Sequence, residues 1–202
     1  MRRLEVLHLI LAWSLTALSV TTVAASDYII VPGHSVGRVW IGAKRNTVHE
    51  VLGKPGETRQ RHDGLTEESW LSNNSPTKSK ASDFLKILYK GSRVIQIEAT
   101  SPRFSAWGLS RRSNPHIIRK RFRQMWISVY AYPVEGKWLT RYYYDNARRG
   151  ITFTVPVRNA KEVATQFESV IVHRRGHKVI PEAGGQMLGS SYPDRKYSDS
   201  NK

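Results

Sequence analysis

The chain has 202 residues, enough for one domain or two small ones. Its 32 Lys and Arg against 16 Asp and Glu give a formal net charge of +16, which favours polyanionic partners: nucleic acid, lipid headgroups or acidic wall polymers. It has no cysteine, which excludes disulfides, thiolate metal sites, thiol catalysis and a lipoprotein anchor on cysteine.

The first 25 residues are typical of a secretory signal peptide. Arg2 and Arg3 give a basic start, residues 7–20 form an apolar run, and residues 23–25 offer the small side chains that a signal peptidase reads. A membrane span needs roughly 20 apolar residues, so an uncleaved membrane anchor is the less favoured alternative. We therefore expect residues 1–25 to be removed and the mature protein to be exported, to a periplasm or out of the cell, without a transmembrane segment. Export favours an anionic lipid or wall polymer over nucleic acid as the partner.

Residues 26–105 are expected to form a first unit of one short helix and several strands. Thr47 and Glu50 have the spacing of a capping box, and Gly53 with Pro55 ends the helix within about two turns. Alternating apolar residues predict strands at residues 27–31, 36–41, 67–72, 85–89 and 93–99.

Residues 106–178 are expected to form a second unit of similar content, followed by a tail. Ser113 and Pro115 mark the start of a helix, and strands are predicted at residues 126–132, in a hairpin over 138–155, and at 167–173. Residues 179–202 have no periodicity and few large apolar side chains, which predicts a disordered tail. A chain cut after about Arg175 should therefore keep its fold.

The strand over residues 151–155 indicates how the sheet is buried. Ile151, Phe153 and Val155 share one face, and Thr152 and Thr154 share the other. This alternation predicts an antiparallel sheet with one buried face and one wet face. Phe153→Ala should then cost about 3–5 kcal/mol, and Thr152→Ala under about 1 kcal/mol.

The two units predict an internal repeat. One offset places Gly42 on Gly108 and Thr47 on Ser113. A short helix followed by a small antiparallel β-meander, made twice, is an α+β arrangement. Each unit alone would bury too little apolar surface to be stable, so we expect both to pack into one globular domain.

A family resemblance rests on short motifs within residues 36–173. They are Val36-Gly37, Ile41-Gly42, the helix of residues 47–52, Gly53-Lys54-Pro55, the hairpin residues Tyr144, Gly150, Ile151 and Phe153, and the strand Val170-Ile171-Val172. These motifs resemble the SmpA/OmlA outer-membrane assembly lipoproteins, and the tandem form is similar to the β-lactamase inhibitory proteins. The resemblance implies a repeated helix-plus-sheet fold, export, and protein binding without catalysis. This chain lacks the cysteines of both groups, so no partner and no binding residue carries over.

The sequence predicts no catalytic residue, no metal site and no cofactor. Gly33, Ser35 and Gly37 fit the pattern of a hydrolase nucleophile elbow, but an alternating segment follows where the elbow needs a helix. We therefore interpret Ser35 as part of a glycine-rich turn. His173 and His177 are four residues apart, but the two arginines between them would oppose a cation.

The predicted second helix is the best candidate contact surface. Its candidate contact residues are basic ones on and beside the helix and two aromatic ones that follow it. The basic residues are Arg111, Arg112, Arg119, Lys120, Arg121 and Arg123, and the aromatic residues are Trp126 and Tyr130. Such a surface could hold an anionic polymer or a headgroup layer. The alternative is an ordinary solvated helix face, since surface helices are normally charged.

Two functional classes follow from these patterns. The first is an exported, non-catalytic binding or envelope-assembly module that holds another protein through an open sheet face. The alternative is a basic envelope-associated protein that binds anionic polymer or lipid headgroups. A small hydrolase is a distant third, and we expect the chain not to be an enzyme.

Overall fold

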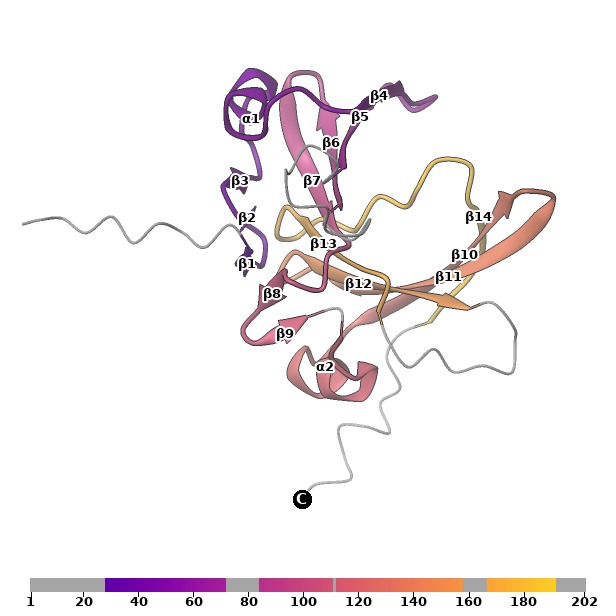
Figure 1. Ribbon diagram of the computed structural model, residues 1–202. Coiled ribbons are helices and arrows are strands. Elements are labelled where there is room, and N and C mark those ends of the chain that lie inside the picture. Colours follow the sequence, from indigo (N-terminus) through magenta and orange to yellow (C-terminus); the bar gives the residue numbers. More distant parts are fainter. Residues whose placement is uncertain (1–27, 72–83, 111, 158–166, 192–202) are drawn as a thin grey trace, which may run out of the picture.

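A nine-stranded antiparallel sheet dominates the fold (Figure 1). The computed structural model describes residues 28–71, 84–110, 112–157 and 167–191. The strands of the sheet are β4 (Glu57–Gln60), β5 (Thr66–Leu71), β6 (Phe84–Lys90), β7 (Arg93–Ala99), β10 (Trp126–Val134), β11 (Lys137–Asn146), β12 (Ile151–Val157), β13 (Ser169–His173) and β14 (Gln186–Ser191). Their order across the sheet is β14-β10-β11-β12-β13-β7-β6-β5-β4.

Smaller elements accompany this sheet. They are a three-stranded sheet of β1 (Ile30–Val31), β2 (Ser35–Val36) and β3 (Val39–Trp40), a hairpin of β8 (Ser105–Ala106) and β9 (Leu109–Ser110), and the helices α1 (Arg45–Leu52) and α2 (Pro115–Arg121). The helices have eight and seven residues, so neither helix of the described chain could cross a membrane. The N-cap of α1 is Lys44, whose backbone is extended, so the predicted capping box at Thr47 is wrong.

The predicted α+β fold of two helix-plus-meander units is wrong, because the chain is mostly β and its large sheet is continuous. β13, the last strand expected in the second unit, lies between β12 and β7. Val172 of β13 is opposite Ile151 on one side and Ile97 on the other. Hydrogen bonds therefore join the two expected units at the centre of one sheet, and the internal repeat is not supported. The division of the chain at residues 105 and 106 stays a prediction.

One face of the sheet carries the main apolar core, as the alternation in β12 predicts. Ile151 and Phe153 are fully buried, and the Phe153 ring centroid lies 5.2 Å from that of Phe122 and 5.1 Å from that of Phe167. The same cluster contains residues from the small sheet and from both helices: Ile30, Val36, Val39, Val48 and Ile118. The prediction that Ile151 and Phe153 face the core is confirmed.

The other face of the sheet is also buried at its centre, so the predicted wet face is wrong. Thr152 and Thr154 are both fully buried. Residues 174–185, which we call the strap, follow β13 and contact this face. Val179 of the strap is buried against it, and Ile180 exchanges two hydrogen bonds of 2.9 Å with the side chain of Gln96. Alternation within one strand does not reveal which later segment returns to cover the polar side.

The disordered tail predicted from residue 179 does not hold for residues 179–191. The chain from Gln186 to Ser191 forms β14, which pairs with β10 at the edge of the sheet. Backbone pairing supplies this order, and it does not need the apolar periodicity that the sequence lacks. The predicted signal peptide at residues 1–25 and the last part of the tail, residues 192–202, lie outside the described residues.

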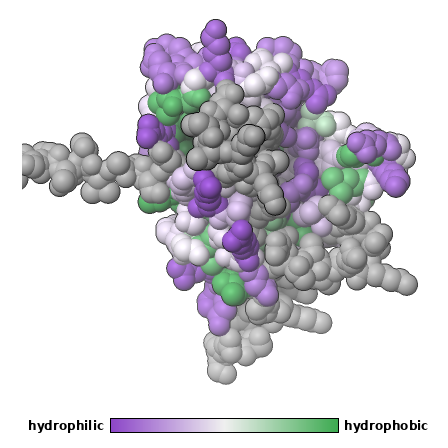
Figure 2. Space-filling model, in the orientation of Figure 1, coloured by the Kyte–Doolittle hydropathy of each residue, from purple (hydrophilic) through white to green (hydrophobic). Residues whose placement is uncertain are grey.

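The face of the molecule that Figure 2 shows is mostly polar. Figure 2 shows hydrophilic residues over much of the visible face, with hydrophobic residues in small separate areas. Charge is therefore a better guide to a functional site than an extended apolar surface.

Candidate anion-binding groove

A groove of about 870 Å³ is lined by five arginines. We call it the arginine groove, and its lining residues are Arg121, Arg123, Arg148, Arg149, Arg175, Pro32, Trp107, Gln124 and Asn146. They come from the end of α2 and the segment after it, from the turns between β1 and β2 and between β8 and β9, from the end of β11 and the turn after it, and from the start of the strap.

Close contact at Gly150 brings three of these segments together. The Gly150 carbonyl accepts hydrogen bonds from the backbone N–H of Gly33 at 3.0 Å and of His173 at 3.1 Å. A Cβ on Gly150 would lie 2.3 Å from the His173 carbonyl oxygen and 2.7 Å from the Gly33 Cα, so only glycine fits. This approach places the turn that carries Arg148 and Arg149 next to the strap that carries Arg175.

Asn146 ties a further part of the groove to this point. Its side-chain Nδ2 donates to the Arg123 carbonyl at 3.0 Å, and its Oδ1 accepts from the Arg149 backbone N–H at 3.0 Å. Asn146 is itself buried. These hydrogen bonds therefore hold the segment after α2 next to the β11–β12 turn, and they fix this part of the groove wall.

Within the described part of the chain, no acidic side chain balances the positive charge of the groove. No carboxylate lines it, and none of the five arginines forms an ion pair with an acidic residue of the described chain. Arginines elsewhere do: Arg45 donates to Glu68 at 2.8 Å, and Arg141 Nε lies 2.7 Å from a Glu168 carboxylate oxygen. Like charges that converge without partners repel one another, and an anionic ligand would relieve that repulsion.

The arginines differ in how firmly they are held. The Arg149 guanidinium lies 5.1 Å from the Trp107 ring centroid and 5.5 Å from that of Phe122, which are cation–π distances. Arg175 donates to the Pro32 carbonyl at 3.3 Å. For the side chains of Arg123 and Arg148 the described residues provide no hydrogen bond or ion pair, so these two guanidinium groups are free to meet a ligand.

The residues predicted from the sequence divide between the groove and other places. Arg121 and Arg123 line the groove, whereas Arg112 and Lys120 are exposed outside its lining. Arg111 and the side chain of Arg119 lie outside the described part of the chain.

The predicted aromatic contacts, Trp126 and Tyr130, do not line the groove. The ammonium of Lys178 lies 4.8 Å from the Trp126 ring centroid. Tyr130 makes an edge contact with Tyr143 at 5.4 Å on the strap side of the sheet. The aromatic residue that the structure places in the groove is Trp107.

Sequence reasoning missed Trp107 and the arginines of the two later segments. A signal was present, because Arg148-Arg149-Gly150 and Arg174-Arg175-Gly176 both read Arg-Arg-Gly. In each segment the glycine has a positive φ and ends a tight turn that presents the arginines. Two such turns in a strongly basic chain could have indicated a shared site.

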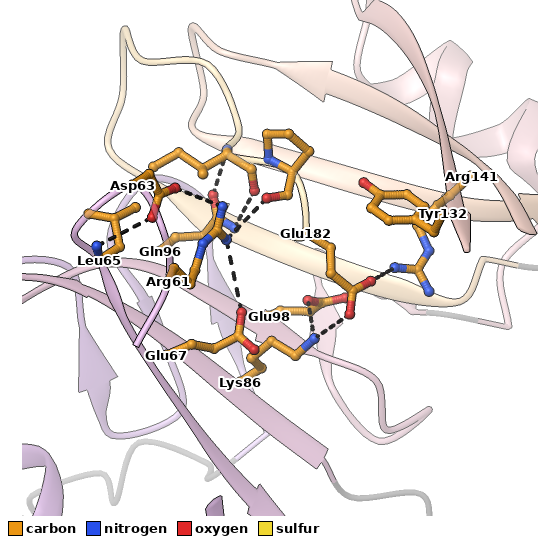
Figure 3. Close-up of polar contacts among 12 residues, drawn as sticks. Arg61, Asp63, Leu65, Glu67, Lys86, Gln96, Glu98, Tyr132, Arg141 and Glu182 are labelled. Atoms are coloured by element: carbon orange, nitrogen blue, oxygen red, sulfur yellow. Dashed lines mark hydrogen bonds and ion pairs between the residues drawn. The ribbon is translucent and has the colours of Figure 1, made fainter. Parts of the chain in front are cut away.

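A second polar cluster holds the strap to the sheet (Figure 3). Glu182 of the strap pairs with Arg141 and, at 3.2 Å, with Lys86. Arg61 donates to the carbonyl of Pro181 at 3.1 Å. Burial opposes ionisation of Glu182, but Lys86 and Arg141 outweigh it and hold the pKa of this carboxyl below its ordinary value. Charges in this cluster are matched, so its arrangement is that of a structural clamp.

Thr152, Asp145 and His173 form a buried triad that differs from a catalytic one. Thr152 donates to Asp145 Oδ1 at 2.9 Å, and His173 Nε2 lies 3.0 Å from the same oxygen and 3.1 Å from the Thr152 hydroxyl. A catalytic triad uses one ring nitrogen for the nucleophile and the other for the carboxylate. Here one nitrogen faces both groups, and all three residues are buried.

The remaining sequence candidates lie in ordinary structural positions. Ser35 is in β2 opposite Trp40, and strand β3 follows it, so this segment lacks the geometry of a nucleophile elbow. His177 is exposed, apart from the buried His173. Across the described ranges, no group of three or more His, Asp or Glu side chains could hold a metal ion.

Comparison with known proteins found distant structural similarity alone. No family model matches the chain, and no curated protein matches its sequence. Its structure is similar to an extracellular protein containing a SCP domain from Bacillus anthracis str. Ames (TM-score 0.42, 9% identity, 67% of this chain and 44% of that one). It is also similar to a cysteine-rich secretory protein from Staphylococcus aureus subsp. aureus Mu50 (TM-score 0.42, 12% identity, 82% of this chain and 57% of that one). This chain spans less than two thirds of either protein, and similarity at this level assigns it no activity.

The resemblance to the SmpA/OmlA lipoproteins and the β-lactamase inhibitory proteins is wrong. No family model matches the chain, and neither of these families is an exception. The repeated helix-plus-meander fold that the resemblance implied is also not the fold of this chain. Its motifs were short turn and strand patterns, which many antiparallel sheets share.

Proposed function

We propose that this chain is an exported, non-catalytic module that binds an anionic polymer of the cell envelope in the arginine groove. The observation that carries the proposal is the convergence of five arginines around one groove that no carboxylate of the described residues lines. Guanidinium groups pair with phosphate, sulfate and carboxylate through two parallel hydrogen bonds, so the groove suits a ligand that carries several such anions.

The shape of the site favours a polymer over a lipid surface. A headgroup layer is broad and flat, and it would be held by basic residues spread over a convex face. Here the arginines line the walls of a hollow of about 870 Å³. A flexible chain can enter such a hollow and present successive anions to opposite walls.

The sheet face expected to bind another protein is not open in the structure. A protein-binding or envelope-assembly module was expected to use an open sheet face. The main core covers one face of the sheet, and the strap buries the centre of the other. The arginine groove is the better supported binding surface.

Binding of defined polymers to the mature protein, residues 26–202, tests the proposal. Polyphosphate and dextran sulfate should bind, neutral dextran should not, and affinity should fall steeply with added salt because counterions are released. Replacing Arg123 and Arg148 together by Gln should weaken binding by about tenfold or more, since each charge-assisted hydrogen bond contributes about 1.5–3 kcal/mol.

Two matched double variants control for net charge. Lys54→Gln with Arg59→Gln removes the same charge from exposed positions outside the groove lining, and should change affinity by less than about twofold. Arg112→Gln with Lys120→Gln tests the basic helix face outside the groove. Equal losses in all three variants would show that binding is a property of net charge. Binding to anionic vesicles but to neither polymer would favour the headgroup hypothesis.

A further inference from the structure

Two residues of the groove wall have an unfavourable backbone conformation. The non-glycine residues of the described chain with positive φ are Trp107 (51°), Gln124 (63°) and Glu135 (48°). Trp107 and Gln124 both line the arginine groove. Residues other than Gly, Asn and Asp rarely adopt a positive φ, and such residues cluster at functional sites.

Trp107 is an unusual residue for its turn. It forms the two-residue connection between β8 and β9 with Gly108, and both residues have positive φ, as in a type I′ turn. Asn and Gly are the residues that such a turn favours. The indole stacks on Phe122, with centroids 5.2 Å apart and an interplanar angle of 19°, yet Trp107 remains 50% exposed. The turn does not require a tryptophan, and the core does not enclose it.

We propose that the anionic polymer of the groove is a polysaccharide, with Trp107 as the platform for a sugar ring. This inference rests on the proposed function and names its ligand class. The carbon-bound hydrogens of a pyranose form an apolar face that packs flat on an aromatic ring. The Gln124 amide offers both a donor and an acceptor, which is what sugar hydroxyls need. The arginines then pair with the sulfate, phosphate or carboxylate groups of the chain.

The presence of one aromatic residue in the groove favours a polysaccharide over single-stranded nucleic acid as the ligand. Proteins that bind single strands stack successive bases on successive aromatic side chains. Among the described residues, Trp107 is the sole aromatic one in the groove lining, and its neighbours in the wall are mostly arginines and amides. A polymer of phosphate alone would use the arginines, and Trp107 would then serve only to hold Arg149 through its cation–π contact.

The Trp107→Asn variant tests the inference, because Asn suits positive φ and removes the ring. It should weaken binding of dextran sulfate by about three- to tenfold more than it weakens binding of polyphosphate, because the sugar loses its aromatic contact whereas polyphosphate loses only the support that the ring gives Arg149. Trp107→Phe keeps a smaller ring and should lie between wild type and Trp107→Asn. Thermal unfolding of each variant checks that the fold is retained.

A second measurement uses the unaltered protein. Dextran sulfate should shift the indole N–H resonance of Trp107 in a nitrogen-15 spectrum more than polyphosphate does, with Trp107→Phe assigning the signal. The inference is overturned if Trp107→Asn weakens both polymers equally or neither. It also fails if oligo(dT) depends on Trp107 more strongly than dextran sulfate does, which would indicate nucleic acid. Failure of every anion to bind wild type would instead refute the proposed function.

Discussion

Two adjacent residues of β12 show how differently the faces of the sheet are stabilised. Phe153 packs between Phe122 and Phe167 in the apolar core. Thr152 points the other way and donates a hydrogen bond to Asp145, whose second oxygen accepts the backbone N–H of Val179 in the strap at 3.2 Å. Both side chains are fully buried, so the polar one is held by satisfied hydrogen bonds and not by contact with water.

Thr152→Val should lower the free energy of unfolding by about 1–3 kcal/mol, because it keeps the volume and removes the hydroxyl that Asp145 and His173 share. Phe153→Ala should lower it by about 3–5 kcal/mol, the usual loss for a buried aromatic. Thr152→Ser retains the hydroxyl and serves as the control. Denaturant unfolding measures all three. If Thr152→Val left the free energy of unfolding unchanged, the buried hydroxyl would contribute no more to stability than the hydroxyl of a solvent-exposed threonine.

At the scale of elements, the strap is the segment that the sequence least predicts. It follows β13 near the centre of the sheet and leads to β14 at the far edge. Its contacts are to strands of both halves: Gln96 of β7, Lys86 of β6 and Tyr143 of β11. A polar segment without periodicity can be ordered when its backbone groups and charges find partners, as these do.

A chain that ends at Arg175 should be less stable by roughly 3 kcal/mol or more, because it loses buried Val179 and leaves Gln96 and Asp145 without their strap partners. A chain that ends at Ser191 keeps every strap contact and is the control. Thermal unfolding compares the two. Equal midpoints would restore the prediction, made from sequence, that the segment after Arg175 is dispensable.

The ion pairs of Glu182 with Lys86 and Arg141, which form the clamp, should make the free energy of unfolding depend on pH. Lys86 and Arg141 overcome the effect of burial and lower the folded-state pKa of Glu182 below its ordinary value near 4.5. Its contribution is therefore fully present above about pH 4.5 and is lost as the pH falls through the folded pKa, since the unfolded state binds the proton more readily. Glu182→Gln should be less stable than wild type at neutral pH, and the difference should narrow on acidification.

Unfolding in denaturant from about pH 7 to about pH 3 measures this dependence. Glu57→Gln alters an exposed glutamate of β4 and should keep the wild-type slope. Some slope will remain in Glu182→Gln because Arg45 and His49 outweigh burial and lower the pKa of Glu68 as well. Identical slopes in wild type and Glu182→Gln would contradict a role for the clamp.

At the scale of the whole molecule, local patterns predicted strands better than they predicted their arrangement. The alternation at residues 151–155 located β12 and its core face correctly. No local pattern could place β13 between β12 and β7, because that position is set by pairing between residues far apart in the chain. For the same reason, the sequence predicted only some of the groove residues. Arg121 and Arg123 lie on the basic helix and just after it, whereas Arg148 and Arg175 reach them through contacts at Gly150.

The continuous sheet predicts that the halves of the chain depend on each other. A cut between residues 112 and 113 keeps the β8–β9 hairpin whole and separates β7 from β13, whose pairing joins Ile97 to Val172. The first fragment would expose the edge of β7, and the second would lose more than half of the buried residues of the main core, so each would bury too little apolar surface to fold alone.

Fragments 26–112 and 113–191 should therefore lack cooperative unfolding when separate and regain it when mixed, because the β7–β13 pairing can re-form between chains. Circular dichroism during heating follows both samples, with the uncut chain 26–191 as reference. Dextran sulfate should bind the mixture and neither fragment, since Trp107 lies in one fragment and the five groove arginines lie in the other. Cooperative melting of either fragment alone would show that the two units first expected from the sequence are independent domains that happen to share a sheet.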